Sequence, residues 1–345
     1  MKSVCIFTLY SELGASSKYR AYLYKESLES KFNVKWFPFW GDVYVAKYMH
    51  HKKKYALRIA LMFVVSFVKR FIWLFFVAPK ADVVFIQKSC FPKCRFTLLK
   101  RLKKKNIRIV YDVDDAVYTE KRDSSDRIAS FSDAVICGND SLRKHYLAYN
   151  KNVFFLPTVE NTNLFQPYWT DTFENKTIGW IGSLTTINNL DLVVNAINRI
   201  VEKYPQVNFI IISNGALDYE SKIKNTKLIK WSKDSYISDL SSITVGIMPL
   251  KDNEYNRGKC GFKLIQYMNL KKPVIASDVG TNREIVGACG FLADSENEWY
   301  DTLERILMKR NDYDKLTDNI EKEFFKKYNY SNNAEQLISI LDGTK

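Results

Sequence analysis

The sequence is poor in the residues that build metal and disulfide sites. It has three histidines, and its six cysteines are scattered over 345 residues without one C-x-x-C pair. Zinc sites need clustered cysteine and histidine ligands, so this pattern argues against one. Isolated cysteines are typical of small buried side chains in a reducing compartment.

The chain also lacks low-complexity tracts and internal repeats. Its first residues, MKSVCIFTLY, have no apolar core followed by a small-residue cleavage site, and they read better as a first strand. We therefore expect a cytoplasmic protein. With 46% hydrophobic and 26% charged residues, 345 residues suit two globular domains of about 150–170 residues each.

Positive charge is abundant and unevenly spread. The whole chain carries +14, whereas residues 50–108 alone hold 16 lysines and arginines against one acid, Asp82, for a net +15. The rest of the chain is therefore close to neutral. A basic surface of this kind attracts either nucleic acid or an anionic membrane.

One apolar run needs its own explanation. Residues 55–78 are long enough to span a bilayer, but Lys69 and Arg70 lie inside the run, where two adjacent charges would be costly. The basic flanks, Trp73 and five phenylalanines favour a helix that lies in the membrane interface. The alternative is a helix buried against the N-terminal sheet with its charges at an edge.

Apolar runs that alternate with helical stretches predict two parallel sheets. The strands are expected at 3–10, 32–39, 81–88, 107–113, 133–139 and the start of 152–167, and then at 176–183, 208–215, 226–232, 243–250, 273–280 and 290–294. We place two Rossmann-like domains at 1–160 and 161–327, with a C-terminal helix, 328–345, that crosses back to the first. In such folds ligands bind beyond the carboxyl ends of the strands.

The loop before the predicted helix 261–270 has the chemistry of a phosphate site. Arg257, Lys259 and Lys263 bring three cations to a helix start, where backbone N–H groups also favour an anion. Gly261 permits close approach of a ligand, and Gln266 is placed to bond a ribose hydroxyl. The alternative is that these cations are solvated charges.

Together with IGWIGSLTTINNL and VYDVDDAVY, this loop resembles the bacterial glycosyltransferase family 4 enzymes. The resemblance runs from GASSKYR through KCGFK to the C-terminal helices, and the order of the motifs is specific. It implies an α/β GT-B fold, in which two Rossmann-like domains face each other across a cleft. It also implies a retaining, metal-independent enzyme without cofactor, with a nucleotide-sugar donor in the second domain and an acceptor held mainly by the first.

The match departs from the family where two glutamates, spaced E-x7-E, are usual. Here Gly258 and Gln266 occupy those positions. Because glycine offers no side chain to the donor sugar, we expect Asp252 or Glu254 to supply that contact.

Relatives also carry Arg and Lys after the first strand of the second domain, whereas this chain has Gly182, Ser183, Asn188 and Asn189 there. The cations near 257–263 are therefore expected to neutralise the diphosphate instead. The predicted donor-binding residues are Gly182, Ser183, Asn214, Arg257, Lys259, Gly261, Phe262, Lys263 and Gln266. Second-rank candidates, which loop capping or core packing would equally explain, are Gly215, Trp231, Ser232, Tyr236, Asn282, Arg283 and Glu284.

The first domain supplies the predicted acceptor residues. Asp114 and Asp115 end a strand, where a carboxylate can bond or help deprotonate an acceptor hydroxyl, although they would equally suit a helix N-cap pair. The acceptor-binding candidates are Gly14, Lys18, Arg20 and Asp114; the alternative for 14–20 is an ordinary helix start. The catalytic candidates are Asp114, Asp115, Arg257 and Lys263. Asp112 is expected to support its strand end.

The sequence thus predicts transfer of a sugar from a nucleoside-diphosphate sugar to an acceptor hydroxyl. The basic, aromatic segment 50–108 suggests a lipid-linked saccharide acceptor and peripheral attachment to an anionic membrane surface at the inner face of the cell membrane. A GT-B nucleotide-sugar epimerase is the alternative. Nucleic-acid binding is disfavoured, because an apolar run interrupts the basic segment and no nucleic-acid module is present.

Overall fold

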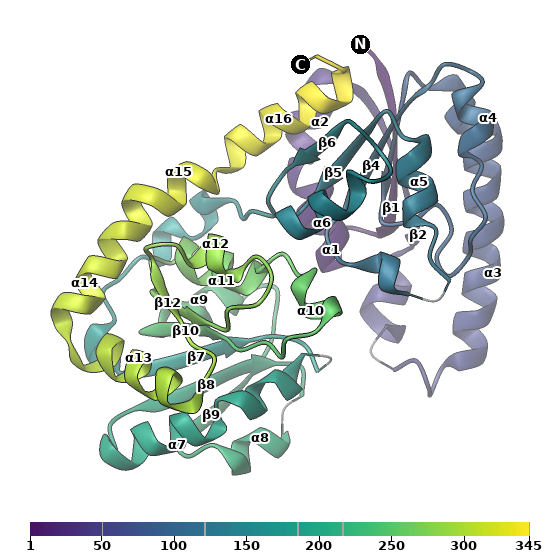
Figure 1. Cartoon of the computed structure of the whole chain (residues 1–345). Helices are drawn as coiled ribbons and strands as arrows, with labels where there is room; N and C mark the ends of the chain where they lie inside the picture. Colours follow the sequence, from purple (N-terminus) through teal and green to yellow (C-terminus); the bar gives the residue numbers. More distant parts are fainter. Residues whose placement is uncertain (50, 121, 185, 216, 345) are drawn as a thin grey trace. The chain divides into compact units, whose positions relative to one another are not determined.

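The chain folds into two compact α/β units. The computed structural model describes residues 1–49, 51–120, 122–184, 186–215 and 217–344. The first unit is Met1–Thr158 with Ser331–Lys345, and the second is Val159–Tyr330. Each unit contains one six-stranded parallel sheet with helices packed on it (Figure 1).

The first unit is built on a sheet of strand order β2-β1-β3-β4-β5-β6. Its strands are β1 (Ser3–Tyr10), β2 (Asn33–Trp40), β3 (Val83–Gln87), β4 (Arg108–Val113), β5 (Ala134–Cys137) and β6 (Val153–Phe155). Its helices are α1 (Ala15–Arg20), α2 (Lys25–Lys31), α3 (Ala56–Ile72), α4 (Leu99–Lys103), α5 (Ser125–Phe131), α6 (Asp140–Tyr146) and most of α16 (Tyr330–Asp342). All six predicted strands are confirmed. The central strands β3, β4 and β5 are almost wholly buried, as continuous apolar runs predict, whereas β2 and β6 at the two sides of the sheet are only partly buried.

Helix α16 returns the end of the chain to the first unit. Asn333 Nδ2 donates a hydrogen bond of 2.8 Å to the carbonyl oxygen of Pro157. Arg108 Nη2 donates one of 2.9 Å to the carbonyl oxygen of Ile340. These bonds tie both ends of the helix to the first sheet and its last connection.

The second unit has the strand order β12-β11-β10-β7-β8-β9. Its strands are β7 (Thr177–Ile181), β8 (Asn208–Ser213), β9 (Thr226–Lys230), β10 (Val245–Met248), β11 (Val274–Ala276) and β12 (Gly290–Leu292). Its helices are α7 (Val194–Lys203), α8 (Leu217–Lys222), α9 (Tyr236–Ser241), α10 (Glu254–Arg257), α11 (Phe262–Asn269), α12 (Asn282–Val286), α13 (Glu296–Met308), α14 (Arg310–Asn319) and α15 (Phe325–Lys327). The predicted strands and the helix 261–270 are confirmed.

Helix α3 (Figure 1) contacts β2. One face of the helix packs on the first unit and the other is exposed. The packed face covers an aromatic cluster around Phe39 and Trp40 with Phe63 and Phe67. With the turns that follow it, the helix runs over Ala56–Lys80 and is long and apolar enough, by length and composition, to cross a membrane. Its exposed apolar residues, the α3 stripe, are Leu57, Leu61, Val64, Val65, Val68, Ile72 and Phe76.

The structure corrects the expected position of Arg70. This side chain is fully buried, and its guanidinium donates hydrogen bonds to the carbonyl oxygens of Thr8 at 2.6 Å, Phe37 at 3.0 Å and Cys90 at 3.2 Å. Arg70 therefore lies neither in a membrane interface nor at an edge of the sheet. It fixes the middle of the helix to the first sheet.

Candidate functional site

In the second unit, the loops that follow β7, β8, β10 and β11 gather at one edge of the sheet, because parallel neighbouring strands all end there. Gly182 follows β7, Asn214 follows β8, and residues 249–261 follow β10. The predicted donor residues thus come from neighbouring strand ends, although they lie up to 84 positions apart in the printed sequence.

Gly261 sets the entry into helix α11. It adopts a left-handed conformation with φ +60°, which side chains disfavour, and a Cβ there would lie 2.2 Å from Cδ1 of Ile285. A larger residue here would have to adopt this disfavoured conformation and displace the side chain of Ile285. The first turn of α11 then offers its backbone N–H groups and positive dipole end to an anion.

Lys263 occupies that first turn. Its Nζ lies 5.4 Å from the centre of the Trp180 ring, and a Cβ on Gly182 would lie 2.9 Å from its Cε. Burial, and secondarily the nearby charge of Lys259, lower the pKa of Lys263 to about 8. Among the residues that the structure describes, no oxygen atom pairs with this ammonium group. An anion bound beside it would therefore gain a strong electrostatic partner.

The structure gives Arg257 a partner of its own. The exposed guanidinium binds both carboxylate oxygens of Asp252, from Nε at 2.6 Å and from Nη2 at 2.8 Å. This contact lowers the pKa of Asp252. Lys259 lies over the ring of Tyr255 at 4.2 Å. A diphosphate would therefore compete with Asp252 for Arg257, whereas it would meet Lys263 without that competition.

Gln266 is buried against a carboxylate that sequence reasoning missed. Its Nε2 donates a hydrogen bond of 3.3 Å to Oε1 of Glu160, and the hydroxyl of Tyr236 donates one of the same length to the same oxygen. Glu160 is buried as well. A second carboxylate at position 266 would repel Glu160, which explains why an amide stands there. Glu160 lies in an irregular connector, where the sequence carries no signal of pairing.

The remaining second-unit candidates divide into exposed and internally bonded residues. Ser183 and Asn214 are exposed at the ends of their strands. Asn189 accepts a hydrogen bond of 3.0 Å from the backbone of Lys251. Asn282 donates one of 3.0 Å to the carbonyl oxygen of Ser277, and Arg283 pairs with Asp278. The last two contacts support the capping alternative for that loop.

In the first unit, the ends of β1, β3 and β4 bring a second polar cluster together. Lys88 Nζ lies 3.2 Å from Asp114 Oδ1 and 2.5 Å from Asp115 Oδ2. The hydroxyl of Ser16 donates a hydrogen bond of 2.8 Å to Asp114 Oδ2. Burial lowers the pKa of Lys88, but the two carboxylates outweigh it and raise this pKa well above its ordinary value. The two aspartates therefore hold a lysine and form no helix N-cap pair.

The position of Lys88 in the sequence already points to this cluster. This lysine is the residue directly after β3, and β3 is the neighbour of β4, so its side chain begins at the same sheet edge as Asp114. It adopts φ +65°, which places it in a sharp turn. Gln87, just before it, donates to Ser16 Oγ at 2.7 Å and accepts from Ser17 Oγ at 2.8 Å.

The structure removes Arg20 from the acceptor candidates. Its guanidinium is 1% exposed, binds Asp112 at 2.5 Å and donates a further bond of 2.7 Å to the carbonyl oxygen of Leu156. Asp112 is equally buried, as expected of a residue that supports its strand end. Gly14 packs against Tyr10, where a Cβ would come within 2.3 Å. Lys18 is half-buried beside Tyr19.

No group of three or more histidine, cysteine, aspartate or glutamate side chains suited to a metal ion occurs within the described part of the chain. In the polar cluster of the first unit, the carboxylates of Asp114 and Asp115 are already paired with Lys88.

Comparison with known proteins finds a family match within the second unit and similar folds for the whole chain. Residues 175–309, inside the second unit, match the family model described as "Glycosyl transferases group 1". The HepE protein of Anabaena in complex with UDP-glucose aligns with TM-score 0.72 at 13% identity, over 99% of this chain and 100% of its own. WaaB, a lipopolysaccharide outer core galactosyltransferase, aligns with TM-score 0.66 at 12% identity over 98% of both chains. The fold is GT-B.

Two further similar structures show how far these comparisons reach. TarM of S. aureus aligns with TM-score 0.57 at 16% identity, over 75% of this chain and 55% of TarM, so this chain spans about half of TarM's length. A UDP-GlcNAc 2-epimerase from Neisseria meningitidis aligns with TM-score 0.59 at 13% identity, over 100% of both chains. No curated protein matches the sequence. By sequence, residues 175–309 are similar to a glycosyltransferase domain, and by fold the whole chain is similar to GT-B proteins.

Proposed function

We propose that this GT-B chain is a retaining, metal-independent family 4 glycosyltransferase that moves a sugar from a nucleoside-diphosphate sugar to a hydroxyl group of a lipid-linked saccharide. It would act in the cytoplasm, attached peripherally to the inner face of the cell membrane, in polysaccharide or glycan assembly. The observation that carries the proposal is Lys263 at the start of α11, within the segment that matches group 1 glycosyltransferases. Among the described residues no oxygen atom pairs with its ammonium group, which lies over the Trp180 ring.

The residues around Lys263 are assigned to the leaving diphosphate. Lys263 and Lys259 supply fixed positive charge, and the start of α11 supplies backbone N–H groups. Arg257 would also bind the diphosphate if its hydrogen bonds to Asp252 were broken. The UDP-glucose bound to HepE supports a nucleotide sugar as the donor. Gln266 and Glu160 are assigned to the nucleoside, next to Tyr236.

The proposed reaction depends on positive charge placed beside the leaving diphosphate. The bond between the anomeric carbon and the diphosphate oxygen breaks, and its electron pair stays on that oxygen, where Lys263 stabilises it. The acceptor oxygen bonds to the anomeric carbon on the same face and passes its proton to the departing phosphate. Asp114, held by Lys88 and Ser16, is assigned to orient the acceptor hydroxyl.

The test uses purified protein with a panel of nucleoside diphosphates and their sugars. At least one of them should raise the melting temperature of the wild type, and should raise that of Lys263→Ala much less. A labelled donor should then transfer its sugar to a membrane lipid extract, with retained anomeric configuration by NMR. An isomerised sugar from donor and enzyme alone would establish the epimerase instead, and no response to any nucleotide would refute the proposal.

A further inference from the structure

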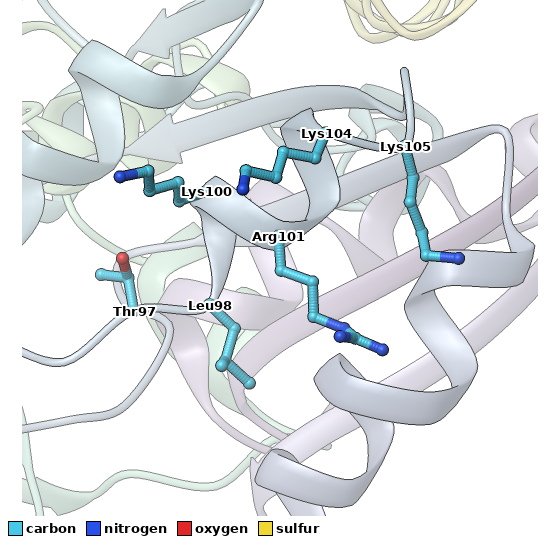
Figure 2. A pocket seen from close by; sticks show the side chains of 6 residues that line it. All are labelled: Thr97, Leu98, Lys100, Arg101, Lys104 and Lys105. Atoms are coloured by element: carbon cyan, nitrogen blue, oxygen red, sulfur yellow. The ribbon is translucent and has the colours of Figure 1, made fainter.

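A basic hollow of the first unit lies outside both polar clusters. It has a volume of about 510 Å³ and is lined by Thr97, Leu98, Lys100, Arg101, Lys104 and Lys105. In Figure 2, Lys100 and Lys104 extend to one side of the α4 turn, and Arg101 and Lys105 extend to the other. The two residues of each pair are four positions apart, and on a helical turn this spacing brings their like charges close together. Such a pair is unfavourable unless a bound anion offsets the repulsion.

The protein does not neutralise these four cations itself. Among the described residues, none of the four pairs with a carboxylate, whereas Lys103, on the same helix, pairs with Asp133. Arg101 instead lies over the ring of Phe75, 3.9 Å from its centre. The hollow therefore keeps its charge available for an external anion.

Aromatic side chains connect the hollow to the α3 stripe. Phe75, whose ring lies under Arg101, packs edge-on against Phe76, with 4.8 Å between the ring centres. The side chain of Phe76 is 59% exposed. On the other side Phe75 stacks with Phe71 at 5.6 Å, and Phe71 stacks in turn with the exposed Phe96. A charged hollow thus continues directly into an exposed apolar surface.

We infer that the hollow at residues 97–105 binds the phosphate headgroup of an anionic membrane lipid, with the α3 stripe lying among the acyl chains. The inference rests on the membrane attachment in the proposed function and assigns it a binding site. A lipid matches both parts, because it joins a phosphate to hydrocarbon, whereas a free phosphate or a nucleic acid matches the cations alone. Since Arg70 fixes α3 to the sheet, the helix lies along the membrane surface rather than across it.

The test is flotation of the full chain with phosphatidylcholine vesicles that contain or lack phosphatidylglycerol. The wild type should bind the anionic vesicles at least about tenfold more tightly than the neutral ones. The fourfold variant Lys100→Gln, Arg101→Gln, Lys104→Gln, Lys105→Gln should lose that preference. A control with the same change of net charge in the second unit, Lys224→Gln, Lys227→Gln, Lys230→Gln, Lys233→Gln, should keep it.

A second variant tests the apolar half of the site. Leu61→Ser, Val64→Ser, Val68→Ser changes exposed residues only and should weaken binding to both vesicle types. Soluble glycerol phosphate should compete poorly with vesicles. Equal binding by the hollow variant and the wild type, equal losses in hollow and control variants, or binding unaffected by the serine changes would each overturn the inference.

Nucleotide-induced melting shifts, measured on the same proteins, separate this inference from the proposed function. The hollow and stripe variants should respond to the donor like the wild type, because their substitutions lie in the first unit. If the wild type binds vesicles as described but responds to no nucleotide, the proposed function fails and the lipid site stands.

Discussion

Lys263 reaches the face of Trp180 because residue 182 has no side chain. Its Nζ lies 5.4 Å from the ring centre, and a Cβ on Gly182 would come within 2.5 Å of that ring and 2.9 Å of Lys263 Cε. The glycine after β7 thus leaves the space in which the cation of α11 is held.

We expect Gly182→Ala to lower affinity for a nucleoside diphosphate about tenfold, because the added methyl group displaces Lys263. Calorimetric titration measures this loss. Gly41→Ala is the matched control, since a Cβ there meets no atom within 4 Å, and its affinity should equal that of the wild type. Unchanged affinity in Gly182→Ala would separate Lys263 from the nucleotide.

The lowered pKa of Lys263 predicts a pH dependence of nucleotide affinity. In the free protein this pKa is about 8, and a bound diphosphate favours the charged form, so the pKa in the complex is higher. The affinity for the nucleotide should therefore stay constant below pH 8. Above pH 8 it should fall by up to about tenfold per pH unit, until the pH reaches the pKa of Lys263 in the complex.

Lys263→Arg provides the control for this pH profile. A guanidinium stays charged throughout the range, so any loss of affinity from the changed geometry should be the same at pH 7 and pH 9. An identical fall with pH in the wild type and in Lys263→Arg would assign the titration to another group.

Arg70→Met should destabilise the first unit by about 3 kcal/mol, because three buried carbonyl oxygens lose their donor. Chemical unfolding measures the change. Lys69→Met, at the neighbouring exposed position, should stay within about 0.5 kcal/mol of the wild type. If both variants unfold at the same denaturant concentration, the hydrogen bonds of Arg70 do not stabilise the fold.

Asp114→Asn should reduce the rate of sugar transfer about a hundredfold and leave nucleotide affinity unchanged. An amide can still accept the hydrogen bond from Ser16 but carries no charge for an acceptor hydroxyl. Glu120→Gln, at an exposed position nearby, should transfer sugar like the wild type. A transfer rate equal to that of the wild type would leave Asp114 with a structural role only.

The sheets were predictable because buried parallel strands need short apolar runs, and every run that was predicted as a strand is a strand in the structure. Gly261 was predictable for a related reason, since a loop that enters a helix beside a ligand needs a residue without a side chain. Lys263 followed from its place in that helix.

Partners across long sequence separations were not predictable. Arg70 looked like a charge inside an apolar helix, and only the folded sheet reveals the carbonyl oxygens around it. Arg20 looked exposed until β4 brought Asp112 beside it. Glu160 and Gln266 lie 106 positions apart, and a single sequence offers no means of pairing them.

Calorimetric titration with a nucleoside, its monophosphate and its diphosphate tests the central claim most directly. If Lys263 and its neighbours hold the leaving diphosphate, affinity should rise at each added phosphate, and Lys263→Ala should remove most of the gain that the second phosphate brings. The exposed Lys322→Ala, in the same unit, should retain that gain. Equal affinity for all three ligands, or an unchanged gain in Lys263→Ala, would contradict the account.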